Sequence, residues 1–265
     1  MCGFAGTINL NGLDTNINLE KKMQNALDRL YPRGPDQQGK WVDDKSYFVH
    51  SRLSIIDTSE GGKQPMKKYN RVLVYNGEIY NFKELRKKLI DSGYIFSSSS
   101  DCEVLIAGWD KWGDKFLNYI NGMYAFAIWD INLQKLTLVR DPYGKKPLLY
   151  MVKKKEISFA SDLKSLEKII SCGDVNTEAV DSLFRFRFIR DPLTIYNNVN
   201  KLPAGHIIEF DYKGFKIRKW YTLPIKIFSN SNKQELYPKI TELFDKAVNK
   251  RLVSDVPLGV LLSGG

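Results

Sequence analysis

The sequence predicts an α+β fold in which two stacked sheets are covered by helices. Three observations predict this class: an early run of strand-like segments, amphipathic helical segments that come in pairs, and a second run of strand-like segments. The chain has 265 residues, of which 43% are hydrophobic and 26% are charged. This ordinary globular composition argues against disorder, collagen-like repeats and coiled coils, and it supports one large domain or somewhat more.

The N-terminal half alternates predicted strands with predicted helices. A strand over 4–10 ties the N-terminus into a sheet, and apolar residues at helical spacing predict a helix over 19–30 that Pro32 stops. The later elements are strands over 47–50, 53–56 and 71–75, the last broken by Asn76-Gly77, a helix over 82–90 and a helix that begins at Asp101.

The C-terminal half is predicted to carry most of the sheet. The predicted elements are four strands between 123 and 160, helices over 162–170 and 177–184, and a hairpin over 207–221. Proline and a polar Ser-Asn stretch mark 222–233 as a linker. A helix over 236–248, a buried strand over 256–262 and a glycine-rich turn then follow the order in which nucleotide-binding α/β domains begin.

The charge distribution does not indicate a nucleic-acid partner, and the apolar runs do not indicate a membrane-spanning segment. Lys and Arg number 40 against 30 Asp and Glu, a formal charge of +10, but the lysine clusters at 153–155 and 213–219 fall in predicted turns and hairpins. A solvated lysine-rich surface is favoured over nucleic-acid binding, which stays a distant alternative. The apolar runs are far shorter than the roughly 20 residues that cross a bilayer, and no signal segment opens the chain. We therefore expect a cytoplasmic protein.

The cysteines and histidines are too few and too scattered for a disulfide scaffold or a zinc site. Cys2, Cys102 and Cys172 are an odd count without a CxxC pair, and only His50 and His206 accompany them. We expect no metal site in this chain.

Cys2 is the most informative single residue. If Met1 is removed, Cys2 carries both a thiol and an α-amine, whose reference pKa of about 7.7–8.0 lets the amine accept the thiol proton near neutrality. The nucleophile and its base then belong to the same residue, and no histidine is needed as the base. From its position alone, the favoured interpretation of Cys2 is a small apolar residue at the start of a strand.

A series of short motifs decides between these two interpretations of Cys2. They are CGFAG at 2–6, RGPD at 33–36, RLSIID at 52–57, NGEIYN at 76–81, SDCE at 100–103, RDPYGKKPL at 140–148, ASDLK at 160–164, LPAG at 202–205 and DVPLGVLLSGG at 255–265. Together they resemble the class II glutamine amidotransferase domain of asparagine synthetases, an N-terminal-nucleophile hydrolase. The resemblance runs the length of the chain in order.

The resemblance implies a domain plan. It implies a four-layer αββα sandwich over 2–221, the linker over 222–233, and the first helix and strand of an α/β ATP-pyrophosphatase domain over 234–265. We accordingly expect the chain to be a fragment of a longer protein.

The resemblance also implies catalytic roles. Cys2 attacks the side-chain amide of glutamine, ammonia leaves, and water cleaves the resulting thioester. The side-chain amide of Asn76 and the backbone N–H of Gly77 form the oxyanion hole, for which a neutral donor and a residue that permits close approach are well suited. Taken alone, Asn76-Gly77 is more typical of a tight hairpin turn.

The glutamine pocket implied by the resemblance pairs a cation with an anion. Arg52 binds the α-carboxylate through its planar fork, and Asp101 binds the α-ammonium. The other residues implied are Leu53, Ser54, Ile55, Ile56, Asn76, Gly77 and Glu78. The alternatives are a surface salt bridge from Arg52 to Asp57 or Glu60 and a helix-dipole role for Asp101. Tyr31-Pro32 departs from the Arg-His of the family, which puts the conformation of that loop in doubt.

For the whole protein, the resemblance implies glutamine, aspartate and ATP as substrates and asparagine as the product, with ATP and Mg²⁺ serving the synthetase domain and no cofactor the glutaminase domain. The ATP-binding residues implied are Leu261, Ser263, Gly264 and Gly265. A homodimer is compatible with this family. Two alternatives remain: a glutaminase domain that feeds another acceptor, such as a polysaccharide carboxylate, and a catalytically idle domain retained for folding or assembly.

Overall fold

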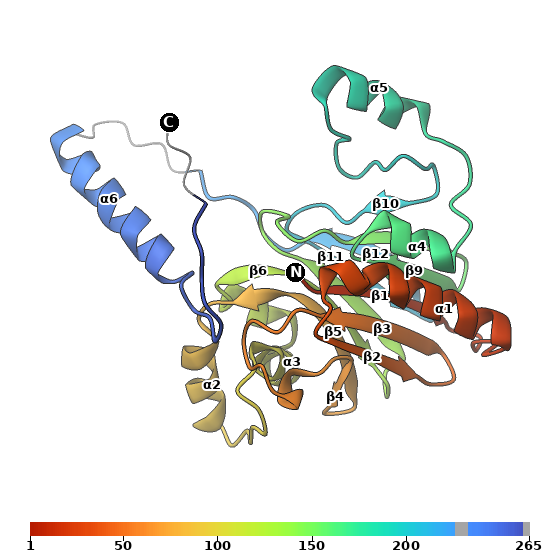
Figure 1. The fold of residues 1–265 in the computed structure, drawn as a ribbon, viewed down its shortest axis with the longest axis horizontal. Coiled ribbons are helices and arrows are strands. Elements are labelled where there is room, and N and C mark those ends of the chain that lie inside the picture. The colour runs from red at the N-terminus through yellow and green to blue at the C-terminus, as the bar shows by residue number, and fades with distance from the viewer. Residues whose placement is uncertain (226–232, 262–265) are drawn as a thin grey trace.

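Two six-stranded antiparallel sheets stack face to face in the computed structural model, which describes residues 1–225 and 233–261 (Figure 1). Sheet A contains β1 (Gly3–Asn9), β2 (Gln37–Val42), β3 (Ser46–Arg52), β8 (Leu149–Lys153), β9 (Glu156–Ala160) and β10 (Asn200–Lys201). Sheet B contains β4 (Met66–Lys68), β5 (Arg71–Ile79), β6 (Gly122–Asp130), β7 (Lys135–Arg140), β11 (His206–Asp211) and β12 (Gly214–Lys219). Their strand orders are β10-β8-β9-β1-β3-β2 and β12-β11-β7-β6-β5-β4.

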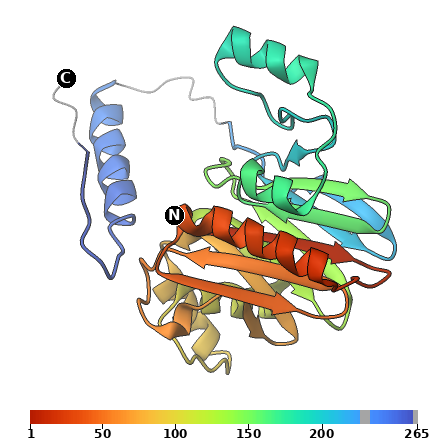
Figure 2. The same ribbon diagram turned by 45° about the vertical axis from the view of Figure 1, so that its right-hand side comes forward.

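Helices cover the outer face of each sheet. These helices are α1 (Ile17–Leu30) and α4 (Leu163–Ile169) on sheet A, and α2 (Phe82–Ile90) and α3 (Asp101–Trp112) on sheet B (Figures 1 and 2). α1 begins at the N-cap Asn16 and buries Met23, Ala26 and Leu30 at helical spacing, which is why it lies flat on the sheet. The predicted α+β sandwich is confirmed.

The strand β1 lies inside sheet A, between β3 and β9. Phe4 pairs with His50 on one side, and Ala5 pairs with Ala160 on the other. Because both edges of β1 are hydrogen-bonded, the position of Cys2, the residue directly before this strand, is fixed at the end of sheet A.

Aromatic side chains fill the space between the two sheets. Phe159 meets Phe4 and Phe48 edge to face, with ring centroids 6.1 and 5.5 Å apart, and all three rings are buried. Such packing is favourable beyond the apolar area that it buries. The two sheets are therefore fixed against each other beneath the N-terminus.

Two predictions about strand boundaries, one after Arg52 and one at Asn76-Gly77, are wrong. Residues 53–56 form a loop after β3 instead of a second strand, because backbone carbonyls of this stretch and the residues after it turn toward the Arg52 guanidinium. Asn76-Gly77 does not end the strand begun at Arg71: β5 continues to Ile79 because β6 pairs with it along its whole length.

The chain beyond 221 forms a helix that stands apart from the sandwich in both ribbon views (Figures 1 and 2). The helix predicted over 236–248 is confirmed as part of α6 (Lys233–Asn249), but its apolar side chains, Ile240 and Phe244 among them, are exposed. Of the predicted linker 222–233, residues 226–232 lie outside the described residues.

The buried strand predicted over 256–262 is also wrong for the part that the structure describes. Val256 is half-buried, residues 257–261 are exposed, and none of them forms a strand, because no described strand lies beside them to share hydrogen bonds. Residue 262 lies outside the described residues. Among residues 1–225 and 233–261, no helix combines the length and the hydropathy that a bilayer-spanning segment requires.

Candidate active site

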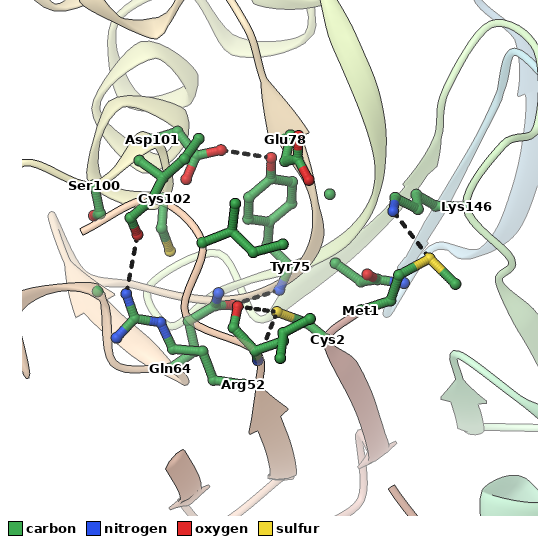
Figure 3. Close-up of a pocket in the computed structure, with 16 residues that line it drawn as sticks. Met1, Cys2, Arg52, Gln64, Tyr75, Glu78, Ser100, Asp101, Cys102 and Lys146 are labelled. Carbon is green, nitrogen blue, oxygen red and sulfur yellow. Dashed lines mark hydrogen bonds between the residues drawn. The ribbon is translucent and has the colours of Figure 1, made fainter. Parts of the chain in front are cut away.

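A pocket lies where the start of β1 faces the end of β5 (Figure 3). Among its lining residues are nine that the sequence predicts for the site: Cys2, Arg52, Leu53, Ile55, Ile56, Asn76, Gly77, Glu78 and Asp101. Ser54 does not line the pocket, and its backbone N–H donates to the carboxylate of Asp36 at 2.7 Å instead. The fold thus gathers residues from four separate stretches of the chain.

The thiol of Cys2 is held by the loop after β3. Its Sγ donates to the carbonyl of Leu53 at 3.5 Å and accepts from the N–H of the same residue at 3.4 Å. Burial raises the pKa of the Cys2 thiol, and the hydrogen bond from the Leu53 N–H partly opposes this rise. The thiol is therefore protonated near neutrality and requires a base before it can act as a nucleophile.

The second half of β5 presents an open backbone edge to the pocket, because β4 pairs only with residues 71–73. The N–H of Tyr75 donates to the side chain of Gln64 at 2.6 Å, and the N–H of Ile79 donates to Asp101 at 3.0 Å. Backbone N–H groups two residues apart in a strand point the same way. The N–H of Gly77, midway between them, therefore points toward the same edge.

Gly77 is also the residue that lets β6 approach β5 closely. A Cβ at Gly77 would lie 2.3 Å from the carbonyl oxygen of Met123 and 2.7 Å from the ring of Tyr75. No side chain larger than hydrogen fits without a shift of backbone, so the position of this N–H depends on glycine.

Asn76 carries a buried amide without a partner in the described part of the chain. Its side chain is 1% exposed, and neither Nδ2 nor Oδ1 makes a hydrogen bond among the described residues. An unsatisfied buried amide costs about 1–3 kcal/mol, so such a group calls for a functional explanation. Here it lines the same pocket as the Cys2 thiol.

The guanidinium of Arg52 is buried and holds the loop that walls the pocket. Nη1 donates to the carbonyl of Ser59 at 2.8 Å and to the side chain of Gln37 at 3.2 Å. Nη2 donates to the carbonyls of Ile56, at 3.2 Å, and of Asp57. The alternative of a surface salt bridge is wrong, because these contacts to Asp57 and the loop are made to backbone oxygens. An incoming carboxylate would have to share or displace these oxygens.

Asp101 is the first residue of α3, and Ser100 caps that helix by accepting from the N–H of Glu103. The Asp101 carboxylate accepts from the phenol of Tyr75 at 2.8 Å as well as from the Ile79 N–H. Burial raises the pKa of Asp101 to about 6, against the effect of these two hydrogen bonds. Asp101 therefore lies ionised in the pocket at neutral pH.

Two further charged groups face each other near the N-terminus. Burial raises the pKa of the Glu78 carboxyl and lowers that of the Lys146 ammonium, and each charge opposes the shift of the other. Lys146 is 4% exposed, and its Nζ donates to the Sδ of Met1 at 3.2 Å (Figure 3). Burial also lowers the pKa of the Met1 amine.

Several lining residues were not predicted from the sequence. They are Met1, Gly62, Gln64, Tyr75, Ser100, Cys102 and Lys146. For Lys146 the motif RDPYGKKPL was a signal, and for Ser100 and Cys102 the motif SDCE was one. The other four have no residue type or spacing that would have marked them. The segment with Tyr31-Pro32 in place of Arg-His is a single 3₁₀ turn, and its last residue, Arg33, donates from Nε to the carbonyl of Cys2 at 3.2 Å.

Neither described histidine lines the pocket. His50 is fully buried between the sheets, where its Nε2 lies 3.0 Å from the carbonyl of Tyr75, and burial lowers its pKa to about 4. His50 is therefore neutral, and the described residues that line the pocket include no imidazole base.

Of the four residues predicted to bind ATP, the structure describes Leu261 alone. Leu261 is fully exposed, and Ser263, Gly264 and Gly265 lie outside the described residues. Their role in ATP binding therefore stays a prediction.

Comparison with solved structures identifies the fold. The glutamine phosphoribosylpyrophosphate amidotransferase of Bacillus subtilis superposes with a TM-score of 0.61 over 84% of this chain and 50% of that one, at 18% sequence identity. A structure titled as the allosteric regulatory enzyme of purine biosynthesis gives a TM-score of 0.59 over the same shares. The chain thus shares the two-sheet sandwich fold of these two enzymes, and the predicted fold class is confirmed.

Sequence comparison identifies the family. The glutamine amidotransferase domain model matches residues 1–221, and the asparagine synthase model matches residues 239–265. Asparagine synthetase [glutamine-hydrolyzing] 1 of Bacillus subtilis is 34% identical over the whole chain, and a putative asparagine synthetase of Methanocaldococcus jannaschii is 33% identical. The chain spans 42% and 55% of the lengths of these two proteins. The chain belongs to the glutamine amidotransferase domain family.

The hydrogen bond from Tyr75 to Asp101 favours the ionised carboxylate, so its removal should raise the pKa of Asp101 above 6. We predict that Tyr75→Phe shifts the carboxyl titration of Asp101, followed by ¹³C NMR, to higher pH. Tyr31→Phe, at an exposed tyrosine, serves as the control and should leave it unchanged. A titration of Asp101 that stays in place or moves to lower pH in Tyr75→Phe contradicts this account.

Proposed function

We propose that this pocket hydrolyses glutamine through a thioester on Cys2. The observation that carries the proposal is the buried amide of Asn76, which has no hydrogen-bond partner among the described residues and lines one pocket with the Cys2 thiol. A hydrogen-bond donor kept without a protein partner is what an oxyanion hole requires, because the donor is then free for the charge that develops in the transition state. The family membership of the chain supports the same reaction.

The first step needs a base beside the thiol. Removal of Met1 would turn the amide nitrogen of Cys2 into an α-amine, which takes the proton from Sγ directly or through water. The N–H of Leu53, 3.4 Å from Sγ, stabilises the thiolate. The thiolate then attacks the side-chain carbonyl carbon of glutamine. A C–S bond forms and the carbonyl π electrons move onto oxygen.

The second step returns these electrons. The Nδ2 group of Asn76 and the N–H of Gly77 stabilise the oxyanion. As the carbonyl re-forms, the C–N bond breaks and the leaving nitrogen takes a proton from the Cys2 ammonium to depart as ammonia. Water then attacks the thioester through a second oxyanion, releasing glutamate and the Cys2 thiol.

Charged side chains select the zwitterionic end of the substrate. Asp101 faces the α-ammonium, and Glu78 adds a second negative group near the same pocket. Arg52 binds the α-carboxylate. The carboxylate accepts hydrogen bonds from guanidinium N–H groups that otherwise donate to loop carbonyls. Leu53, Ile55 and Ile56 line the aliphatic part of the pocket. Asp101 has to be ionised for this purpose, so binding weakens as pH falls through about 6.

For the whole protein we propose that the ammonia serves asparagine synthesis from aspartate at the expense of ATP. The match of residues 239–265 to the asparagine synthase model supports this acceptor. When bound, ATP with Mg²⁺ activates a carboxylate for attack by ammonia, and Leu261, Ser263, Gly264 and Gly265 would contribute to its site. A relative from Gibberella zeae that is 33% identical over 92% of the chain is named amidase chry2, not asparagine synthetase. Transfer of the ammonia to another acceptor is therefore the second candidate.

The proposed base can be tested by controlling the N-terminus. A chain with a cleavable N-terminal extension that leaves Cys2 as the first residue should release glutamate and ammonia from glutamine only after cleavage. Loss of a positioned base costs about 10²–10⁴-fold in rate, so the uncleaved chain should be slower by at least that margin. Cleaved Cys2→Ala is the control and should be inactive. Equal rates before and after cleavage, or activity of Cys2→Ala, contradict the mechanism.

The oxyanion hole can be tested at Asn76. Asn76→Ala should lower kcat for glutamine hydrolysis by about 10²–10³-fold with little change in KM, because the amide acts on the transition state. Asn25→Ala, at an exposed asparagine of α1, is the matched control and should behave as the parent chain. A kcat for Asn76→Ala within threefold of the parent removes the amide from the mechanism.

A further inference from the structure

The segment after α6 returns to the sandwich and binds the loop that walls the glutamine pocket. The N–H of Asp255 donates to the carbonyl of Ile55 at 2.9 Å. The N–H of Asp57 donates to the Asp255 carboxylate at 2.7 Å. One of these hydrogen bonds joins two backbones and the other joins a backbone N–H to a side chain, and both link positions that are far apart in the sequence.

Two other contacts anchor the same segment beside α2 (Figure 1). The guanidinium of Arg251 lies over the ring of Tyr80, 5.3 Å from its centroid, and Val253 packs against the core between sheet B and its covering helices. A cation above an aromatic face is worth about 0.5–1 kcal/mol at exposed sites. Asp255 is therefore the last of three successive contacts along one docked strip of chain.

Asp255 and Arg52 both form hydrogen bonds with one peptide group of the loop. The Ile56–Asp57 peptide accepts from Arg52 Nη2 through the carbonyl of Ile56, at 3.2 Å, and donates to Asp255 through the N–H of Asp57. Hydrogen bonds at the two ends of one peptide polarise each other and fix its plane. The orientation of Arg52, the proposed carboxylate-binding group, is thus linked to Asp255 through one peptide group.

The backbone at this peptide needs such support. Asp57 has a φ of 56°, in the left-handed region that non-glycine residues rarely adopt. Conformations of this kind cost about 1–3 kcal/mol and persist where surrounding contacts determine them. Asp57 receives such contacts from Arg52 on its carbonyl and from Asp255 on its N–H.

We propose that Asp255 is a positioning residue for glutamine binding, which couples the segment matched by the asparagine synthase model to the amidotransferase pocket. This inference rests on the proposed glutamine-hydrolysing function. Asp255 does not line the pocket and acts through Arg52 and the loop 53–59. Since coupling between two sites is reciprocal, movement of the 251–255 strip changes the affinity for glutamine, and bound glutamine holds the strip in place.

The coupling is tested by the kinetics of glutamine hydrolysis on the full chain, prepared with Cys2 as its first residue. Asp255→Ala should raise KM for glutamine about tenfold with kcat within twofold, because a charge-assisted hydrogen bond to the loop is lost while the reacting groups stay intact. Asp255→Asn should restore KM to within threefold of the parent, since an amide oxygen still accepts from the Asp57 N–H. Asp245→Ala, at an exposed aspartate of α6, is the matched control and should match the parent.

Hydrogen exchange without glutamine separates this inference from the proposed function. Amides of the loop 53–59 should exchange faster in Asp255→Ala than in Asp255→Asn or the parent. Unchanged exchange together with an unchanged KM overturns the role of Asp255 alone. An Asp255→Asn variant as impaired as Asp255→Ala overturns positioning through this hydrogen bond. Absence of glutamine hydrolysis in the parent overturns the proposed function, and the role of Asp255 in glutamine binding with it.

Discussion

The site depends on the pairing of β1 with strands on both of its edges. β3 and β9 hold the backbone of residues 3–9. Cys2, which directly precedes this inner strand of sheet A, is thereby held in the pocket. An N-terminus is ordinarily among the most mobile parts of a chain. Here the pairing fixes the chain end against the edge of β5, as the proposed use of one residue as both nucleophile and base requires.

The pocket is also defined by charges that are costly to bury. Arg52, Asp101 and Lys146 are all less than 10% exposed. Arg52 is compensated by backbone carbonyls, and Asp101 by a phenol and a backbone N–H, while burial still raises the Asp101 pKa to about 6. A zwitterionic substrate supplies counter-charges for such groups, so its binding regains part of the free energy that their desolvation costs.

The sequence predicted the sandwich and the family, because alternation, helical spacing and ordered motifs are local signals. Residues 53–56 were predicted as a strand because they are apolar and partly β-branched, and nothing local shows that carbonyls of the loop serve a buried Arg52. Asn76-Gly77 has the composition of a turn, yet pairing with β6 keeps it in β5. The contact between Asp255 and Asp57 depends on tertiary structure and has no sequence signal. The domain boundaries and the roles of the site residues stay predictions.

Cys2 is proposed as the nucleophile, and the three cysteines of the chain allow this role to be measured directly. Cys102 also lines the pocket but is fully buried, and burial raises its pKa well above the ordinary value, while Cys172 lies in the core under α4. A glutamine analogue with a chloroketone in place of the side-chain amide should alkylate one thiol in a chain that begins at Cys2. Peptide mass spectrometry should find the adduct on Cys2, and excess glutamine should prevent it. An adduct on Cys102 or Cys172, or none, contradicts the account.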